Sequence, residues 1–170
     1  MKHVTVRRSV FLFALVGLSA CLATLGLPGT GSAGAGDPQS FTVTAVRTST
    51  GQGGASPQAE SSITCTISID NPHKSTHVPT TVNVVSHWNC DAIVQKLTLD
   101  TKLYRGVQQV GSGHSEGTGT FVLNGNAAAS CVNGQYLGEA TGTVVFPLGY
   151  NPPSGSAGPV DSGVVPIGNC

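Results

Sequence analysis

Charged side chains are scarce in this 170-residue chain, at 9% of its residues. Three of the eight basic residues, Lys2, Arg7 and Arg8, lie at the extreme N-terminus, which leaves five scattered basic residues against eight acidic ones. The remainder of the chain is therefore mildly acidic, with a net charge of −3. Nucleic acids and anionic membranes are bound by clustered basic side chains, so the sequence predicts neither as a partner of this region.

Helical periodicity is also missing beyond the N-terminus. No window shows sustained apolar residues at spacings of three and four, which is the pattern of an amphipathic helix. Instead, 23 glycines and abundant serine and threonine suit short strands joined by many turns. The length is enough for one domain with its own hydrophobic core.

The common catalytic and metal-binding motifs are absent as well. There is no C-x-x-C, no G-x-S-x-G elbow and no metalloprotease or finger pattern, which argues against a zinc site and a serine hydrolase. The glycine-rich stretch Gly111–Gly119 lacks the lysine and the following helix of a phosphate-binding loop, so we expect a hairpin loop there. The acids are isolated in sequence, which neither indicates nor excludes a paired-carboxylate glycosidase. We expect no metal and no cofactor.

Three alternating apolar runs between Ile63 and Tyr104 organise the chain. Successive residues of a strand point to opposite faces, so each run predicts a strand with one buried face. The expected inward residues are Ile63, Cys65, Ile67, Ile69, Val82, Val84, Trp88, Cys90, Leu97, Leu99, Thr101 and Leu103. Trp88 is thus expected to pack in the core against a disulfide rather than to stack on a sugar.

Further strands and turns follow from local signals. Strands are expected at Phe41–Val46, Val107–Val110, Thr120–Leu123, Ala127–Val132 and Val160–Ile167, with Tyr136, Ala140, Val144 and Phe146 inward on another. Asn124-Gly125 and Asn133-Gly134 are expected as hairpin turns, because such pairs tolerate positive φ. Seven or eight short strands, with turns about every ten residues, predict an all-β antiparallel β-sandwich, immunoglobulin-like, with a closed barrel as the alternative.

The N-terminus has the features of an export signal. A basic start precedes the 18-residue apolar run Val10–Leu27, and Ala33–Ala35 matches the small-x-small cleavage pattern. We therefore expect a secreted protein that begins near Gly36. The alternative reads Leu18–Cys21 as a lipobox, with Cys21 lipidated and the protein anchored to the cell surface, but the residues after Cys21 are apolar where a polar tether is usual. An uncleaved anchor is the third option, and only these last two options predict membrane association.

The domain layout follows from these signals. Residues 1–35 are expected to be the signal peptide, 36–61 a flexible N-terminal segment with a first strand, and 62–170 the β-sandwich domain. Within the middle segment, Ser49–Ala59 has the composition of a loop.

Four cysteines lie outside the signal, namely Cys65, Cys90, Cys131 and Cys170. An even number in an exported chain predicts two disulfides, and three pairings are open. We favour Cys65–Cys90 with Cys131–Cys170, because each joins neighbouring segments and the second would hold the C-terminus in place. A simple hairpin about Asn71–Pro79 argues against the first pair, since it would place Cys65 opposite a residue near Val85.

Histidines and one tyrosine are the candidate site residues. His73 and His77 are four apart, but prolines flank them and exclude the helix that would bring both onto one metal. We expect exposed loop histidines, and a metal site would have to recruit His87 and His114 as well. Tyr150 begins the exposed loop Tyr150–Pro153 and is the aromatic residue to test first for binding.

The region from Ile63 to Pro153 resembles a group of small secreted proteins of actinobacteria. The shared features are a cysteine-bearing strand, Asp70-Asn71-Pro72-His73 followed by Ser75, a valine-rich strand ending in Cys90, Leu103–Arg105, Cys131–Tyr136 and Phe146–Pro153. The resemblance implies a secreted β-sandwich protein, and the group carries no assigned activity, so no catalytic residue transfers. The joint presence of Cys65 and Cys90 in the pattern supports their pairing.

Three functions are compatible with the sequence. The first is a non-enzymatic binding module for an extracellular or cell-wall ligand, which uses its loops and has His73, His77 and Tyr150 as candidate binding residues. The second is a secreted hydrolase in which His73, His77 or His114 acts as an acid/base or metal ligand. The third is a protease inhibitor that presents the Asn71–Pro79 loop in extended form. The absence of catalytic motifs favours the first.

Overall fold

The computed structural model describes residues 39–47 and 61–170. The predicted signal peptide (1–35), the lipobox at Cys21 and the predicted loop at Ser49–Ala59 lie outside the described residues. Of the described residues, 76% lie in strands and none in a helix. In this part of the chain no helix is therefore long and apolar enough to cross a membrane.

Within residues 39–47 and 61–170, nine strands form one antiparallel sheet. They are β1 (Ser40–Arg47), β2 (Ser62–Ile69), β3 (His73–Lys74), β4 (Thr81–Arg105), β5 (Gln108–Ser130), β6 (Gly134–Val145), β7 (Tyr150–Asn151), β8 (Ser154–Asp161) and β9 (Val165–Ile167). The segment Phe41–Val46, expected as a first strand, lies within β1 and pairs with β2. The predicted all-β antiparallel fold with two disulfides is confirmed, while its immunoglobulin-like assignment stays a prediction.

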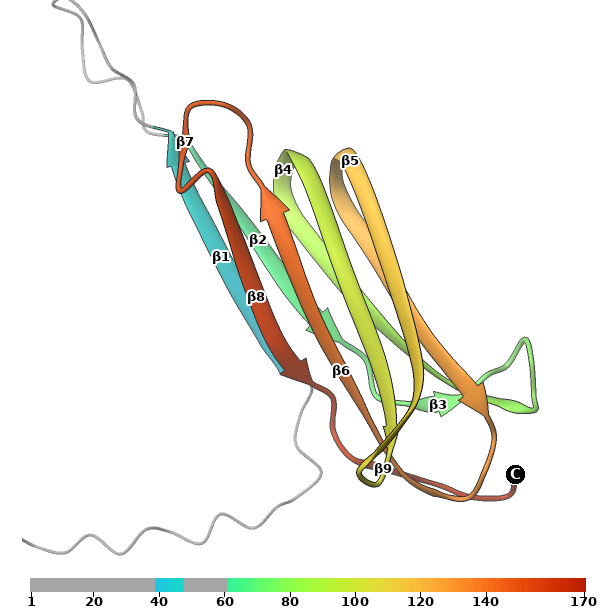
Figure 1. The fold of residues 1–170 in the computed structure, drawn as a ribbon. Coiled ribbons are helices and arrows are strands. Elements are labelled where there is room, and N and C mark those ends of the chain that lie inside the picture. The colour runs from blue at the N-terminus through green and yellow to red at the C-terminus, as the bar shows by residue number, and fades with distance from the viewer. Residues whose placement is uncertain (1–38, 48–60) are drawn as a thin grey trace, which may run out of the picture. The chain divides into compact units, whose positions relative to one another are not determined.

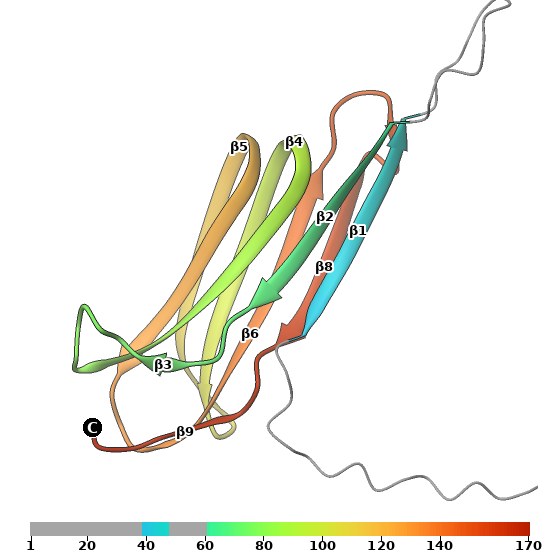
Figure 2. The same cartoon turned by 180° about the vertical axis from the view of Figure 1, so that it is seen from behind.

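β4 and β5 form one long hairpin that folds back over itself (Figure 1). The first half of β4 pairs with β2 and with the second half of β5, whereas the second half of β4 pairs with β6 and with the first half of β5. The register is interrupted between Asn89 and Val94, where the hairpin bends. The sheet consequently has two facing layers. The first layer consists of β1, β2, β3, the first half of β4 and the second half of β5, and it lies nearer the viewer in Figure 2. The second layer consists of β8, β6, the second half of β4 and the first half of β5.

The glycine-rich stretch Gly111–Gly119 is part of strand β5, so the predicted hairpin loop is wrong. Folding of β5 brings its two halves together. A Cβ on Gly111 would lie 2.6 Å from the carbonyl oxygen of Ala128, and one on Gly113 would overlap the carbonyl oxygen of Asn126. Glycine is required there because the backbones approach too closely for any side chain.

The two Asn-Gly pairs are not tight hairpin turns either. Asn124 and Gly125 lie inside β5, opposite His87 and Ser86. Asn133 lies just before β6 and Gly134 is its first residue, and β6 pairs with β4 rather than with β5. In both places long-range pairing overrides a local turn preference.

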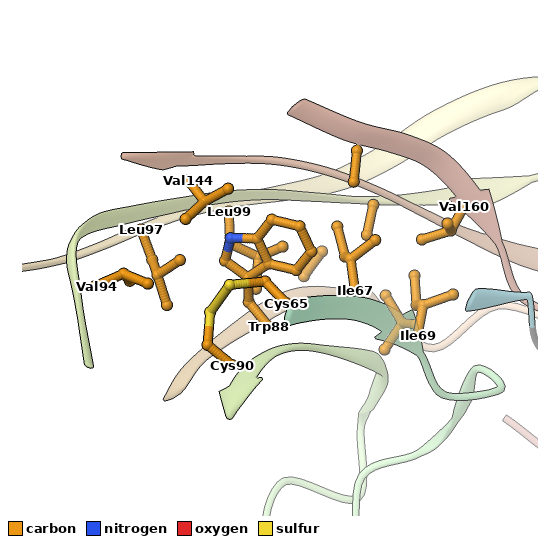
Figure 3. Packing of buried hydrophobic residues seen from close by; sticks show 14 of the residues in the cluster. Cys65, Ile67, Ile69, Trp88, Cys90, Val94, Leu97, Leu99, Val144 and Val160 are labelled. Carbon is orange, nitrogen blue, oxygen red and sulfur yellow. A yellow bond between two sulfur atoms is a disulfide. The ribbon is translucent and has the colours of Figure 1, made fainter. Parts of the chain in front are cut away.

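The core is the one predicted by alternation. All of the expected inward residues between Ile63 and Leu103 are buried, as are Tyr136, Ala140, Val144 and Phe146. Trp88 lies beside the Cys65–Cys90 disulfide (Figure 3), and its Nε1 donates a hydrogen bond of 3.1 Å to the carbonyl oxygen of Thr143 in the second layer. The indole therefore joins the two layers through both packing and a hydrogen bond.

Both favoured disulfides are present, Cys65–Cys90 and Cys131–Cys170. Cys65 and Cys90 are direct cross-strand partners, so the register estimated from a simple hairpin is wrong. The reason is that His73 and Lys74 still pair with β4, which moves the chain reversal to the turn between Ser75 and Thr81.

Candidate binding face

The outer surface of the first layer carries a grid of threonines. Thr42 and Thr44 of β1 lie opposite Thr66 and Thr64 of β2, respectively. Their Oγ1 atoms are 3.4 Å apart in the first pair and 3.2 Å apart in the second. Alternation places all four hydroxyls on one face, because Cys65 between them points into the core. The backbones that carry these hydroxyls are about 4.8 Å apart across the strands, and residues on the same face are about 6.8 Å apart along each strand.

The grid continues across β4 and β5 in register. Thr66 pairs with Asn89, and Ser68 pairs with His87, which in turn pairs with Asn124. We call this surface the threonine face and define it as Ser40, Thr42, Thr44, Thr64, Thr66, Ser68, His87, Asn89 and Asn124. It is a continuous array of hydroxyl and amide groups on four neighbouring strands.

Charge distinguishes the two outer faces. The described strands of the first layer (β1, β2, β3, and residues 81–89 and 122–130) contain two residues among Lys, Arg, Asp and Glu, namely Arg47 at the end of β1 and Lys74 in β3, and neither belongs to the threonine face. The outer face of the second layer carries two Lys–Glu ion pairs, Lys96–Glu116 at 2.9 Å and Lys102–Glu139 at 2.7 Å, and a His114–Asp100 contact of 2.6 Å. The threonine face is therefore polar without being charged, apart from His87.

His87 is held from both sides. Its Nε2 lies 3.1 Å from Oδ2 of Asp70, and its Nδ1 lies 2.9 Å from Oδ1 of Asn124. Burial by itself lowers the pKa of His87, but the hydrogen bonds to Asn124 and Asp70 outweigh it and raise the pKa above 6.5. Because both ring nitrogens are engaged, neither is left to activate the hydroxyl of Ser68 on the neighbouring strand, so this is not a Ser-His-Asp relay.

The loop residues predicted to bind do not come together. His73 lies in β3 and His77 in the turn that follows, both exposed, and Nδ1 of His73 is 3.2 Å from the carbonyl oxygen of Asn71. Tyr150 begins β7 at the opposite end of the sheet (Figure 1). There its ring lies under the guanidinium of Arg47, 5.6 Å from the ring centre, and this contact braces the edge pair of β1 and β7.

The histidines considered for a hydrolase are also separated. His114 projects from the outer face of the second layer and pairs with Asp100, whereas His73 and His77 lie at one end of the first layer. Within residues 39–47 and 61–170, no group of three or more His, Cys, Asp or Glu side chains could hold a metal ion. The geometry offers no shared site for these residues.

The segment considered for an inhibitor loop is only partly a loop. From His73 to Lys74 the chain pairs with β4, and the turn that follows is closed by a 2.9 Å hydrogen bond from Ser75 N to the carbonyl oxygen of Thr81. A protease cleft accepts an extended strand, as in other cases of strand addition. The folded turn gives that function no support.

Two features of the site had been missed in the sequence. Glu139 of β6 and Asp161 of β8 are cross-strand neighbours, and the pKa of Asp161 is raised by its burial and by Glu139. Lys102 bonds Glu139 at 2.7 Å and so joins β4 to β6, whereas Glu139 and Asp161 lie opposite each other as like charges. For the threonine face a signal was available, the Thr-x-Thr repeats at 42–44 and 64–66, but nothing local indicated that they would lie side by side.

Comparison of the chain with protein families, curated proteins and solved structures finds no match. Function is therefore inferred from geometry. The resemblance to secreted actinobacterial proteins stays a prediction.

Proposed function

We propose that the protein is a non-enzymatic secreted binding module that holds a component of the cell envelope or medium against its threonine face. The observation that carries the proposal is the array of hydroxyl and amide groups over paired strands of the first layer, a face whose own residues include no Lys, Arg, Asp or Glu. Two disulfides are compatible with work outside the cell, where such bonds persist. The ligand thus meets a sheet face rather than the loops.

Rigidity supports this assignment. Thr64 and Thr66 flank Cys65, whose disulfide to Cys90 lies directly beneath the face and ties β2 to β4. Side chains fixed by the backbone lose little freedom on binding, which lowers the entropic cost of association. Each threonine hydroxyl can both donate and accept a hydrogen bond, so a ligand can bond to the pairs without breaking them.

The test is retention of the exported protein on isolated cell-wall material. The variant Thr42→Val/Thr66→Val keeps the side-chain shape and removes one hydroxyl pair. The matched control is Thr98→Val/Thr143→Val, which removes a cross-strand pair with a 2.5 Å Oγ1 separation on the second layer. Each lost hydrogen bond contributes about 1 kcal/mol, so the first variant should bind roughly tenfold or more weakly, while the control binds like the wild type.

Both variants should retain their disulfides and unfold cooperatively, as a check on folding. Equal retention of the two variants would overturn the proposal, because the hydroxyl pair on the first layer would then contribute no more than the pair on the second.

A further inference from the structure

We infer that the ligand of the threonine face is a neutral polysaccharide; this inference rests on the function proposed above and specifies its ligand. It follows from three features of the face: its lack of charge, the dual chemistry of its side chains, and the hydrogen bonds that already engage the acids at its border.

The lack of charge selects against ionic ligands. An anionic polymer is recognised by arginine and lysine, and a cationic one by carboxylates. The strand positions of the first layer offer neither, except at its two ends. The guanidinium of Arg47 already stacks on Tyr150, and Nζ of Lys74 in β3 donates a 2.6 Å hydrogen bond to the carbonyl oxygen of Asn169. A ligand that matches this surface carries no charge of its own.

The side chains match a sugar ring in two ways. A threonine presents a hydroxyl and a methyl group together, and a pyranose presents hydroxyls at its edge and C–H groups on its face. The row Thr42, Thr66 and Asn89 crosses three strands and ends at Val122, whose side chain is 39% exposed. Hydroxyl and amide groups on this row can bond sugar hydroxyls, while the methyl groups cover the apolar ring face.

The acids at the border of the face are already engaged. Oδ1 of Asp91 accepts a 3.0 Å hydrogen bond from the backbone N–H of Thr64. Asp70 is bonded to His87, which also contacts Asn124. These acids would still repel a polyanion, while their engagement leaves them poorly placed to attract a cation. Both effects favour an uncharged polymer.

The experiment is native affinity electrophoresis of the exported protein in gels containing one polymer each. Hydroxyethyl cellulose and glycol chitin serve as neutral polysaccharides, and carboxymethyl cellulose is the charged counterpart of the first. Wild type should be retarded by a neutral polymer and less by the charged one. Binding should persist at about 1 M salt, where the screening length falls to about 3 Å. Thr42→Val/Thr66→Val should weaken retardation roughly tenfold, and Thr98→Val/Thr143→Val should leave it unchanged.

The outcomes separate the inference from the function beneath it. If the wall component retained by the threonine face proves to be protein or an anionic polymer, the polysaccharide inference is overturned and the proposed function stands. Retardation by a neutral polymer that Thr42→Val/Thr66→Val does not change would overturn both. If neither neutral polymer retards the wild type, the polysaccharide inference is overturned. Retention on isolated cell-wall material then tests the proposed function by itself.

Discussion

His87 brings a titratable group to the otherwise uncharged threonine face. Its ring bridges Asp70, which follows β2, and Asn124 of β5, so one side chain joins three segments of the first layer. In the imidazolium form both ring nitrogens donate, and this form is favoured because the pKa is raised by the bonds to Asn124 and Asp70 despite burial. The stability of this part of the layer should therefore depend on pH.

The sign follows from the direction of the shift. A pKa that is higher in the folded protein than in the unfolded chain contributes stability that is fully present below pH 6.5 and is lost as the pH rises through the folded value. We expect the thermal midpoint of the wild type to fall, relative to that of His87→Gln, as the pH rises from below 6.5 to above the folded pKa.

Differential scanning fluorimetry of both proteins across this range measures the effect. The other histidines are common to both, so the difference between the two curves isolates His87. Parallel curves would show that the bridge contributes nothing that depends on protonation.

At the scale of elements, strand β5 shows how a glycine pattern can have two meanings. Glycines at 111, 113, 117 and 119 alternate with outward polar residues, which is a strand pattern in which Ser115 supplies the one inward side chain. The glycine content of the same stretch, taken without its partner strands, predicts a loop. What decides between them is the close approach of the two halves of β5.

Gly113→Ala tests this approach. The added Cβ would overlap the carbonyl oxygen of Asn126, and because that group is backbone, the two halves of β5 must separate. We expect a loss of about 1–3 kcal/mol in the free energy of unfolding, the usual cost of overpacking. Urea unfolding followed by Trp88 fluorescence measures it.

The neighbouring substitution Ser112→Ala is the control. Ser112 projects from the outer face of the same strand, so its replacement should change stability by no more than about 0.5 kcal/mol. Equal effects of the two substitutions would mean that β5 is not folded tightly against itself.

At the scale of the whole molecule, the two disulfides have different tasks. Cys65–Cys90 is buried and joins β2 to β4 in the middle of the first layer. Cys131–Cys170 lies at the end of the chain, next to β9, which pairs with the start of β6. Loop-closure entropy alone predicts that each disulfide adds roughly 3–4 kcal/mol to the free energy of unfolding. Only Cys65–Cys90, however, lies within the core.

Hydrogen exchange should separate them. In Cys131→Ser/Cys170→Ser, exchange should accelerate in β9 and in residues 134–136, because this end can fray without opening the layers. In Cys65→Ala/Cys90→Ala, protection should fall throughout the sheet, with a global loss of roughly 3 kcal/mol. A uniform change in the first variant would contradict the assignment of a local role.

The sequence by itself determined the buried faces of β2, β4 and β6, the all-β class and the presence of two disulfides. Alternation is a property of neighbouring residues, so the inward positions of Trp88 and Leu99 could be predicted without knowing any partner strand. The even number of cysteines outside the predicted export signal sufficed to predict two bridges.

Only the tertiary structure decided which distant residues meet. The register that pairs Cys65 with Cys90 and the folding of β5 upon itself depend on long-range strand pairing, and so do the grouping of the threonines on one uncharged face and the contact of Glu139 with Asp161. The physical reason is that local patterns determine the direction of a side chain, whereas neighbours across a sheet are set by a register that no short stretch of sequence contains.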